Sequence, residues 1–424
     1  MSETATVAPA IASSTIAIAK HHGNVGALVM AADYRGLGVV RSLGRRGIPV
    51  WVLRQGGHLV ASTSRYVRRN IPWPAADDRR QIDLLLDLGR KHSLKDWVLF
   101  PTDDHAVALI SRHRDVLASQ YRITVPPWDQ LQFLCDKRLL HQTAQELGIH
   151  QPWTVWPHTR EELGALDCPF PVILKPATRQ RPNTLAVPKA WRVEDRASLL
   201  ASYDEASVLV GPGNLMVQEI VPGAGEGQIS YAAICKDGRP LASIVVRENR
   251  QYPRDFGQFS TYVESVEEPR VVDPAVRLLA SRNFTGLVEI EFKQDPRNGE
   301  FKILDVNPRV WGWHTLSRRA GVDFPHLLWL LVHDQPVPVS HGRSGVRWMH
   351  TTADVPVALQ DMLKGRLSLR SYLRSFQRPR ESAMFAWDDP APGLLDLPLF
   401  ACALVKRLVS GNSKPVLERS NKLA

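Results

Sequence analysis

Acidic and amide side chains alternate with apolar residues in two short stretches of the sequence, and oxygen ligands in this pattern suit a metal ion. Glu289 and Glu291 lie two residues apart in the first stretch, and Asp305 and Asn307 lie two residues apart in the second. Successive side chains of a β-strand point to opposite faces, so such alternation is typical of strands. The pattern therefore predicts two strands, one with two carboxylates on one face and one with a carboxylate and an amide.

The two strands are expected to form a β-hairpin. They span residues 287–293 and 300–306, and Asp-Pro-Arg-Asn-Gly at residues 295–299 favours a turn between them. If the register brings the polar faces together, the carboxylates repel one another unless a positive charge lies between them. Mg²⁺ carried by a nucleotide is the commonest cation of this kind. The alternative is a hairpin whose acidic face is solvated surface.

Length and composition indicate an ordinary globular protein. The 424 residues allow two or three domains, and 44% of them are hydrophobic and 23% charged. The four cysteines have no CxxC spacing, which argues against a zinc site or a disulfide framework and fits a reducing cytoplasm. The net charge of +10 comes without a nucleic-acid recognition motif, so no nucleic-acid partner is expected. No apolar run approaches the ~20 residues of a membrane-spanning helix.

Strands and helices alternate in the N-terminal part of the sequence as in a Rossmann-like α/β domain. Residues 26–53 have the pattern of a strand, a helix that ends at Gly47 and a second strand. A helix at residues 79–92 and a strand at residues 97–101 follow. Arg41 stands where a dinucleotide fingerprint has its third glycine, so the glycines at the first turn are expected to serve the turn rather than NAD.

Several polar and aromatic residues are candidates for substrate contacts. Asp103, Asp104 and His105 follow the strand at residues 97–101, and ligands bind at the carboxyl ends of strands in folds of this kind. Capping of the next helix is the alternative role for Asp103. The other candidates are Arg247, Trp311, Gly312 and Trp313, although the two tryptophans can equally be core residues.

Basic side chains and an exposed strand end in the middle of the chain suit a nucleotide. Lys175 closes an apolar strand, and because burying an unpaired ammonium group is costly, its side chain is expected to reach an anion. The strand at residues 215–220 runs into a Gly-rich connector at residues 221–227, where free backbone groups can hydrogen-bond an adenine edge. A loop with Arg179, Arg181 and Lys189 lies between them in the sequence and is placed to cover phosphates.

Five segments in this order resemble the motifs of the ATP-grasp superfamily of carboxylate–amine and carboxylate–thiol ligases. They are the helix start Asp136-Lys137, the strand VILKPA, the strand end VQEIVPG, the strand GLVEIEF and the segment LDVNPR. The resemblance covers residues 26–335 and implies that the protein binds ATP. It further implies that Lys137, Lys175 and Lys189 hold the phosphates, that Gln218, Glu219 and Ile220 read the adenine edge, and that Glu226 binds the ribose.

The same resemblance implies a catalytic centre at the acidic hairpin. Glu291, Asp305 and Asn307 are similar in position to the ligands of two Mg²⁺ ions, for which Mn²⁺ can substitute. Arg309 resembles the arginine that stabilises the transferred phosphoryl group, and Lys175 is the second residue with an implied catalytic role. Glu289 is then a neighbour of the metal ligands.

The reaction that the resemblance implies is ATP-dependent ligation of a small-molecule carboxylate to an amine. ATP converts the carboxylate, a poor acyl donor, to an acyl phosphate, and the amine then displaces phosphate without help from a protein nucleophile. Glycoside hydrolysis by Glu289 and Glu291 is excluded because two carboxylates on one face of a strand cannot flank a bond. The loop at residues 178–188 lacks the glycines usual in this superfamily. A nucleotide-binding regulatory or scaffold protein is therefore the alternative.

The implied organisation is α/β with four parts. They are a disordered tail (1–22), a Rossmann-like preATP-grasp domain (23–128), an ATP-grasp domain of two α+β lobes (129–217 and 218–335) and a partly helical C-terminal extension (336–424). In the extension, residues 359–376 have the pattern of a basic amphipathic helix. Residues 393–408 are apolar and can lie on a membrane surface, dock on a partner or pack on the chain's own domain. The oligomeric state is not readable from these patterns.

Overall fold

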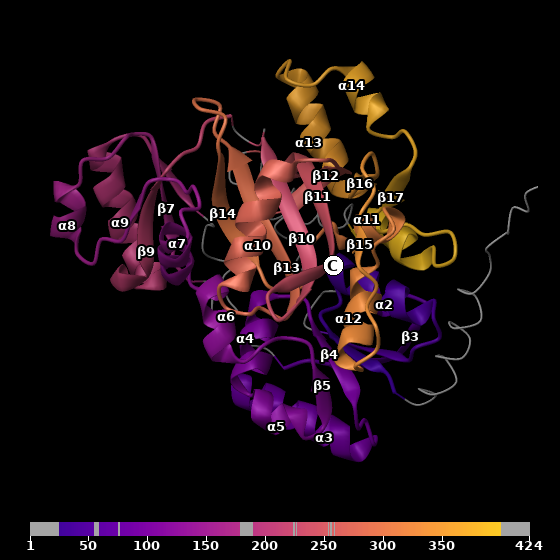
Figure 1. The fold of residues 1–424 in the computed structure, drawn as a ribbon. Coiled ribbons are helices and arrows are strands. Elements are labelled where there is room, and N and C mark those ends of the chain that lie inside the picture. The colour runs from indigo at the N-terminus through magenta and orange to yellow at the C-terminus, as the bar shows by residue number, and fades with distance from the viewer. Residues whose placement is uncertain are drawn as a thin grey trace, which may run out of the picture.

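Three β-sheets form the framework of the protein (Figure 1). The structure, a computed structural model, describes residues 25–54, 59–74, 77–178, 190–223, 225, 227–252, 254, 257 and 259–399. Within these residues, no helix is both long enough and apolar enough to cross a membrane.

The N-terminal sheet is parallel throughout and has the strand order β3-β2-β1-β4-β5. The order reverses between β1 and β4, so the loops that follow these two strands leave the sheet side by side. Mixed α/β structure with an N-terminal Rossmann-like domain is thereby confirmed. The strands are β1 (Ala27–Met30), β2 (Val50–Arg54), β3 (Val67–Pro72), β4 (Trp97–Pro101) and β5 (Tyr121–Ile123). The helices are α2 (Tyr34–Gly44), α3 (Asp78–Lys91), α4 (Asp104–Arg112) and α5 (Arg114–Ala118), with a 3₁₀ turn η1 (Ala61–Thr63).

The second sheet is small and antiparallel, with the order β6-β9-β7-β8, and it has an apolar core of its own. Together with α8 and α9 it forms a lobe to one side of the molecule (Figure 1). Helices α6 (Trp128–Cys135) and α7 (Lys137–Glu146) precede it. Its elements are β6 (Thr154–Val155), α8 (Arg160–Ala165), β7 (Val172–Pro176), β8 (Trp191–Val193), α9 (Arg196–Val210), η3 (Pro212–Asn214) and β9 (Leu215–Glu219).

The third sheet is the largest and contains the acidic hairpin. Its order is β14-β13-β10-β11-β12-β16-β17, and β15 pairs with β11. Its apolar residues share core clusters with those of the parallel sheet, so the two sheets pack as one body. Its strands are β10 (Gln228–Lys236), β11 (Arg239–Tyr252), β12 (Phe259–Ser265), β13 (Gly286–Gln294), β14 (Phe301–Asn307), β15 (Ser340–His341), β16 (Arg347–Met349) and β17 (Arg380–Ser382). Its helices are η4 (Pro269–Val271), α10 (Val272–Ala280), α11 (His314–Arg319), α12 (Phe324–Val332), α13 (Thr351–Leu363) and α14 (Leu369–Arg374).

The register of the hairpin β13–β14 confirms that its polar faces coincide. Glu289 pairs with Asn307 and Glu291 pairs with Asp305 across the two antiparallel strands. Directly opposite residues on one face of an antiparallel pair lie close enough for their side chains to interact. The predicted group of three carboxylates and one amide therefore exists in the fold.

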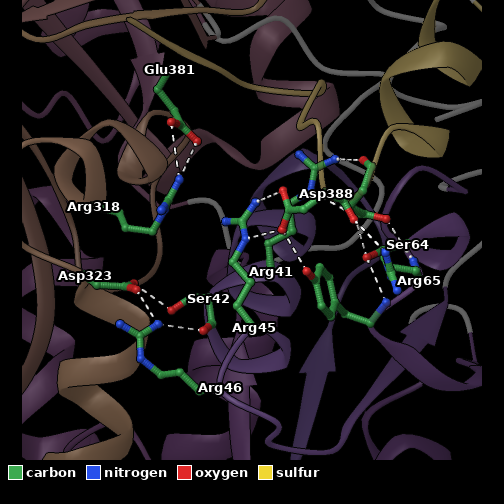
Figure 2. Close-up of polar contacts among 12 residues, drawn as sticks. Arg41, Ser42, Arg45, Arg46, Ser64, Arg65, Arg318, Asp323, Glu381 and Asp388 are labelled. Carbon is green, nitrogen blue, oxygen red and sulfur yellow. Dashed lines mark hydrogen bonds and ion pairs between the residues drawn. The ribbon is translucent and has the colours of Figure 1, made fainter. Parts of the chain in front are cut away.

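The C-terminal part of the chain completes the large sheet and also binds the parallel one. Strands β15 to β17 extend the large sheet beyond Gln335. After β17, Asp388 accepts hydrogen bonds from Arg45 and Tyr66, and Asp389 accepts them from Arg41 and Ser64 (Figure 2). This segment therefore holds α2, whose first residues follow β1.

The single basic helix predicted at residues 359–376 is wrong, because the chain forms α13 and α14 instead. Gly365 between them has a φ of +68°, in the left-handed region that ends helices, and Ser368 caps α14 by accepting from the backbone of Ser371. Residues 391–399 are helical. The rest of the apolar segment and the predicted N-terminal tail lie outside the described residues.

Candidate active site

Two cavities meet at the acidic hairpin. One, of about 440 Å³, lies between the small lobe and the hairpin and is called here the interlobe cavity. The other, of about 160 Å³, lies between the parallel and the large sheet and is called the inner cavity. Glu291 and Asp305 line both, so the predicted metal ligands stand at their junction.

The interlobe cavity collects the residues that were expected to contact a nucleotide. Lys175 at the end of β7 and Gln218, Glu219 and Ile220 at the end of β9 line it, together with apolar residues such as Phe170. The two strands are neighbours in the small sheet, and this pairing brings their ends to the same cavity. Lys189 and Glu226 lie outside the described residues.

The polar side chains at the end of β9 are already bound within the protein. Gln218 donates to Thr154 Oγ1 at 2.9 Å. Glu219 accepts from the backbone of Trp153 and forms ion pairs with Lys302 and Arg297. Burial would raise the pKa of the Glu219 carboxyl, but the hydrogen bonds from Lys302 and Arg297 outweigh it and hold the pKa below its usual range. The side chains of Gln218 and Glu219 therefore serve contacts within the protein.

The inner cavity opens where the strand order of the parallel sheet reverses. Tyr34 and Arg35 follow β1, Asp104 follows β4, and all three line the cavity. Ligands of open α/β sheets bind at this kind of position because loops from neighbouring strands diverge there. From the large sheet, the lining residues include Glu248, Phe259, Ser260, Glu289, Gly312 and Trp313.

Hydrogen-bond donors face each carboxylate at the junction of the cavities. Lys137 Nζ contacts Asp305 Oδ1, and Gln228 Nε2 donates to Glu291 Oε2 at 3.2 Å. Asn307 Nδ2 donates to Glu291 Oε1 at 2.9 Å and to Glu289 Oε2 at 3.1 Å. The like charges of the hairpin are therefore offset by donors from the protein itself.

The donor set at the junction fits Mg²⁺. Glu291, Asp305 and Asn307 offer hard oxygen atoms on one face of the hairpin. In the part of the chain that the structure describes, no group of three or more His, Cys, Asp or Glu side chains is arranged to hold a metal ion. Two carboxylates and an amide therefore leave most of an octahedral shell to phosphate and water, which is how Mg²⁺ binds with nucleotides.

Arg309 lies beside these oxygen ligands, and its positive charge is stabilised by Asp104. Its guanidinium forms an ion pair with Asp104 and donates to Asn307 Oδ1 at 2.9 Å. Burial alone would lower the pKa of Arg309, but Asp104 more than offsets this effect and the pKa is raised. A permanent positive charge thus stands where both cavities approach the hairpin.

Comparison with known proteins agrees with this geometry. A family model described as ATP-grasp in the biosynthetic pathway with Ter operon matches residues 213–352, which include the acidic hairpin and Arg309. Over these residues the chain matches an ATP-grasp family, in agreement with the resemblance of its sequence motifs. A D-aspartate ligase from Enterococcus faecium is 23% identical to it over 254 residues, which are 54% of this chain and 57% of that protein. The matched region thus spans little more than half of that relative.

Solved structures share the ATP-grasp fold at low identity. An L-amino acid ligase from Bacillus licheniformis has a TM-score of 0.56 and 14% identity, covering 72% of this chain and 73% of that one. An N5-carboxyaminoimidazole synthetase from Staphylococcus aureus has a TM-score of 0.58 and 13% identity, covering 81% and 86%. A biotin carboxylase domain from Hydrogenobacter thermophilus, solved with MgADP, has a TM-score of 0.60 and 14% identity, covering 76% and 74%. These likenesses show the fold.

Three of the predicted substrate residues lie outside the two cavities. Asp103 caps α4 by accepting from the backbone of Ala106 at 2.8 Å, and His105 hydrogen-bonds Gln81 at 2.9 Å. Arg247 is exposed on β11. None of them is among the residues that line the two cavities. Asp104, between the first two, is the residue of that group that reaches the inner cavity.

The two tryptophans behave differently from each other. Trp311 is buried against Trp313 and Phe324 and serves the core. Trp313 and Gly312 line the inner cavity. A Cβ atom at Gly312 would lie 2.8 Å from Tyr34 Oη, so the absence of a side chain there allows the close approach of Tyr34.

Tyr34, Arg35, Gln228 and Glu248 are cavity residues that the sequence pattern did not indicate. The turn at residues 34–38 leads into a helix N-terminus where an anion could bind, but its glycines were expected to serve only the tight turn and helix packing. Its position after the first strand of a parallel sheet was a usable signal. Gln228 lies on β10, which pairs with β13, a strand that does not follow it directly in the sequence, and Glu248 lies near the end of β11. No local pattern marks them.

Buried His314 makes the stability of the protein depend on pH. Its Nδ1 contacts Trp311 O at 2.8 Å, and its Nε2 has no hydrogen-bond partner among the described residues. Burial lowers the pKa of His314 to about 4. Between about pH 6.5 and pH 4 the unfolded chain therefore binds a proton that the folded chain does not, and acidification weakens the fold.

We expect His314→Gln to flatten this dependence. The free energy of unfolding of the native protein should fall on acidification from about pH 7 to about pH 5, and the variant should lose about 2 kcal/mol less over the same interval. Denaturant titrations at the two pH values measure the difference. Burial also lowers the pKa of His326 to about 4. His326 is present in both proteins, so part of the pH dependence of stability remains in the variant. An equal pH dependence of the free energy of unfolding in the two proteins would contradict the lowered pKa of His314.

Proposed function

We propose that this protein is an ADP-forming ligase, which activates a carboxylate as an acyl phosphate with Mg²⁺-ATP and joins it to an amine. The observation that carries the proposal is the meeting of two cavities at Glu291 and Asp305, with Asn307 and Arg309 beside them on the wall of the inner cavity. One cavity has the residues suited to a nucleotide and the other has space for the reacting groups. In-line phosphoryl transfer needs this arrangement, with donor and acceptor on opposite sides of one charged junction.

In this proposal the interlobe cavity holds ATP. The adenine lies against the apolar wall and hydrogen-bonds the backbone at the end of β9, while Lys175 contacts the phosphates. Lys137 lines the inner cavity and pairs with Asp305, so it is placed to contact phosphate at the junction. Bound Mg²⁺, held by Glu291, Asp305 and Asn307, would neutralise charge on the phosphate oxygens.

The inner cavity then binds the carboxylate and the amine. Arg309 donates to an oxygen of the transferred phosphoryl group, and Asn307 fixes the direction in which the guanidinium points. The buried, water-poor surroundings strengthen these interactions and protect the acyl phosphate from hydrolysis. Positioning and electrostatics carry the reaction, and no side chain needs to form a covalent bond.

We further propose that one of the substrates is an amino acid. Arg35 and Glu248 on the walls of the inner cavity offer charges of opposite sign, which complement the carboxylate and ammonium groups of an amino acid. The similar proteins named as a D-aspartate ligase and an L-amino acid ligase support this choice.

The proposal is tested by measuring Mg²⁺-dependent ADP release from ATP with pairs of amino acids and other carboxylates and amines. Stimulation by one pair, with the matching amide found by mass spectrometry, is the expected result. Tight binding of ATP without ADP release for any pair would overturn the proposal and favour a nucleotide-binding regulatory or scaffold protein of the same fold.

Lys175→Met should weaken ATP binding about 10- to 100-fold, because a charge-assisted contact with phosphate is lost. Titration calorimetry with ATP in the presence of Mg²⁺ measures the change. Lys236→Met removes an exposed lysine at the end of β10 and serves as the matched control, for which the affinity should stay unchanged. Equal affinities of the two variants would contradict the role of Lys175.

A further inference from the structure

The helices α13 and α14, called here the α13–α14 hairpin, expose an apolar surface. Val355, Leu359 and Leu363 follow each other at intervals of four residues, which places them on one face of α13, and Leu363 is 82% exposed. Leu369 and Leu373 are similarly spaced on α14, and Leu369 is 62% exposed. Grouped exposed leucines are uncommon on a protein surface and mark a site of contact.

The charged residues in the segment that follows Asp361 and contains most of these leucines are all basic. Residues 362–380 contain six basic residues and no acidic residue. Runs of like-charged residues are usually solvated surface, but here Arg370 and Arg374 lie on α14 together with the exposed Leu369 and Leu373. The basic residues are Lys364, Arg366, Arg370, Arg374, Arg378 and Arg380.

The opposite face of α13 is held firmly on the large sheet. Buried Asp354 accepts two hydrogen bonds of 2.8 Å from Arg250 and one of 2.7 Å from Thr261. Asp361 forms an ion pair with Arg254. These contacts fix which face of α13 points outward, and Figure 1 shows the hairpin at one end of the molecule, beyond β12 and β16.

We propose that the α13–α14 hairpin docks on a lipid bilayer that carries anionic headgroups. The leucines enter the boundary between headgroups and acyl chains, and the lysine and arginines contact lipid phosphates. Aliphatic side chains suit this partner better than a nucleic acid, whose bases stack on exposed aromatic rings. Tyr372, an aromatic residue of the hairpin, is packed against Phe376 and Arg250.

Docking of this kind has a consequence for the site. Arg250, which holds the hairpin, and Gln251, which lines both cavities, are neighbours on β11. The hairpin that meets the bilayer is therefore fixed to a strand that borders both cavities.

The test is sedimentation of the full-length protein with lipid vesicles. Vesicles of phosphatidylcholine mixed with phosphatidylglycerol should bind it, and vesicles of phosphatidylcholine alone should not. The triple variants L363Q/L369Q/L373Q and R366Q/R370Q/R374Q should each bind the anionic vesicles at least about tenfold more weakly. All six positions are exposed and outside the two cavities, so ATP binding in solution should be unchanged.

The matched control removes the same charge elsewhere. Arg79, Arg80 and Arg90 are exposed on α3, and R79Q/R80Q/R90Q should leave vesicle binding unchanged. Equal loss in this control would show attraction by net charge alone and would overturn the proposal. So would undiminished binding by either hairpin variant, or binding to RNA or an acidic polypeptide in place of anionic vesicles.

Discussion

Asn307→Ala should lower Mg²⁺-dependent ADP release about 10²- to 10³-fold. The amide lies on the wall of the inner cavity, where it contacts Glu289 and Glu291 through Nδ2 and Arg309 through Oδ1. Its removal takes away a proposed oxygen ligand of Mg²⁺ and one of the two side chains that orient the Arg309 guanidinium, the other being Asp104. Both losses act on the charge that develops during phosphoryl transfer, so turnover should fall more than ATP affinity does.

A coupled assay for ADP, with the best substrate pair, measures this effect as kcat and KM for ATP. Asn298→Ala is the matched control, because Asn298 lies exposed in the turn of the same hairpin and its side chain hydrogen-bonds Glu300. We expect its turnover to equal that of the native protein. Full turnover in the Asn307 variant would remove the catalytic role proposed for the hairpin.

Asp389→Ala should destabilise the fold by about 3–5 kcal/mol, because it leaves a buried guanidinium unpaired. Arg41 and Asp389 form an ion pair at 2.9 Å in which the side chains are only 6% and 1% exposed. Arg41 also donates to the backbone oxygen atoms of Met384 and Asp389. Ser64 and the backbone of Arg65 donate to the Asp389 carboxylate (Figure 2). Burial lowers the pKa of Arg41, against the opposing effect of Asp389.

Denaturant-induced unfolding measures this loss of stability. The exposed ion pair of Arg160 and Asp204, with both side chains 53% exposed, is the control. Asp204→Ala should cost less than about 1 kcal/mol, because water already solvates both charges. The double variant R41M/D389A should recover part of the loss, because no unpaired charge stays buried. A cost for Asp389→Ala no larger than for Asp204→Ala would show that the C-terminal segment does not hold α2.

The acidic hairpin was the most predictable part of the site. Alternation of residues within 287–293 and 300–306, and a turn sequence between them, are local properties, and they predicted both strands and their shared face. The sequence also predicted the end of β7 with Lys175 and the end of β9, because each strand is a short apolar run that ends in polar residues. The roles of these residues and the predicted domain limits stay predictions.

Other parts of the site had no local signal. Asp104 was one of three candidates in a row, and only the pairing of β1 with β4 places it beside Arg35 and Arg309. The break between α13 and α14 depends on Gly365, which the amphipathic pattern did not reveal. Glu289 and Glu291 are equivalent in the sequence, yet burial and the neighbouring Glu248 and Glu291 raise the pKa of the Glu289 carboxyl well above its usual range.

The sequence by itself determined the two strands of the hairpin, the face that carries the carboxylates and the resemblance to the ATP-grasp superfamily, because these depend on spacing over a few residues. The tertiary structure decided which side chains surround that face. Arg41 and Asp389, which are 348 residues apart, meet only after three sheets have packed, and Lys137 reaches Asp305 across 168 residues. Contacts between residues so far apart in the sequence follow from strand order and sheet packing, and periodic patterns along the chain do not predict them.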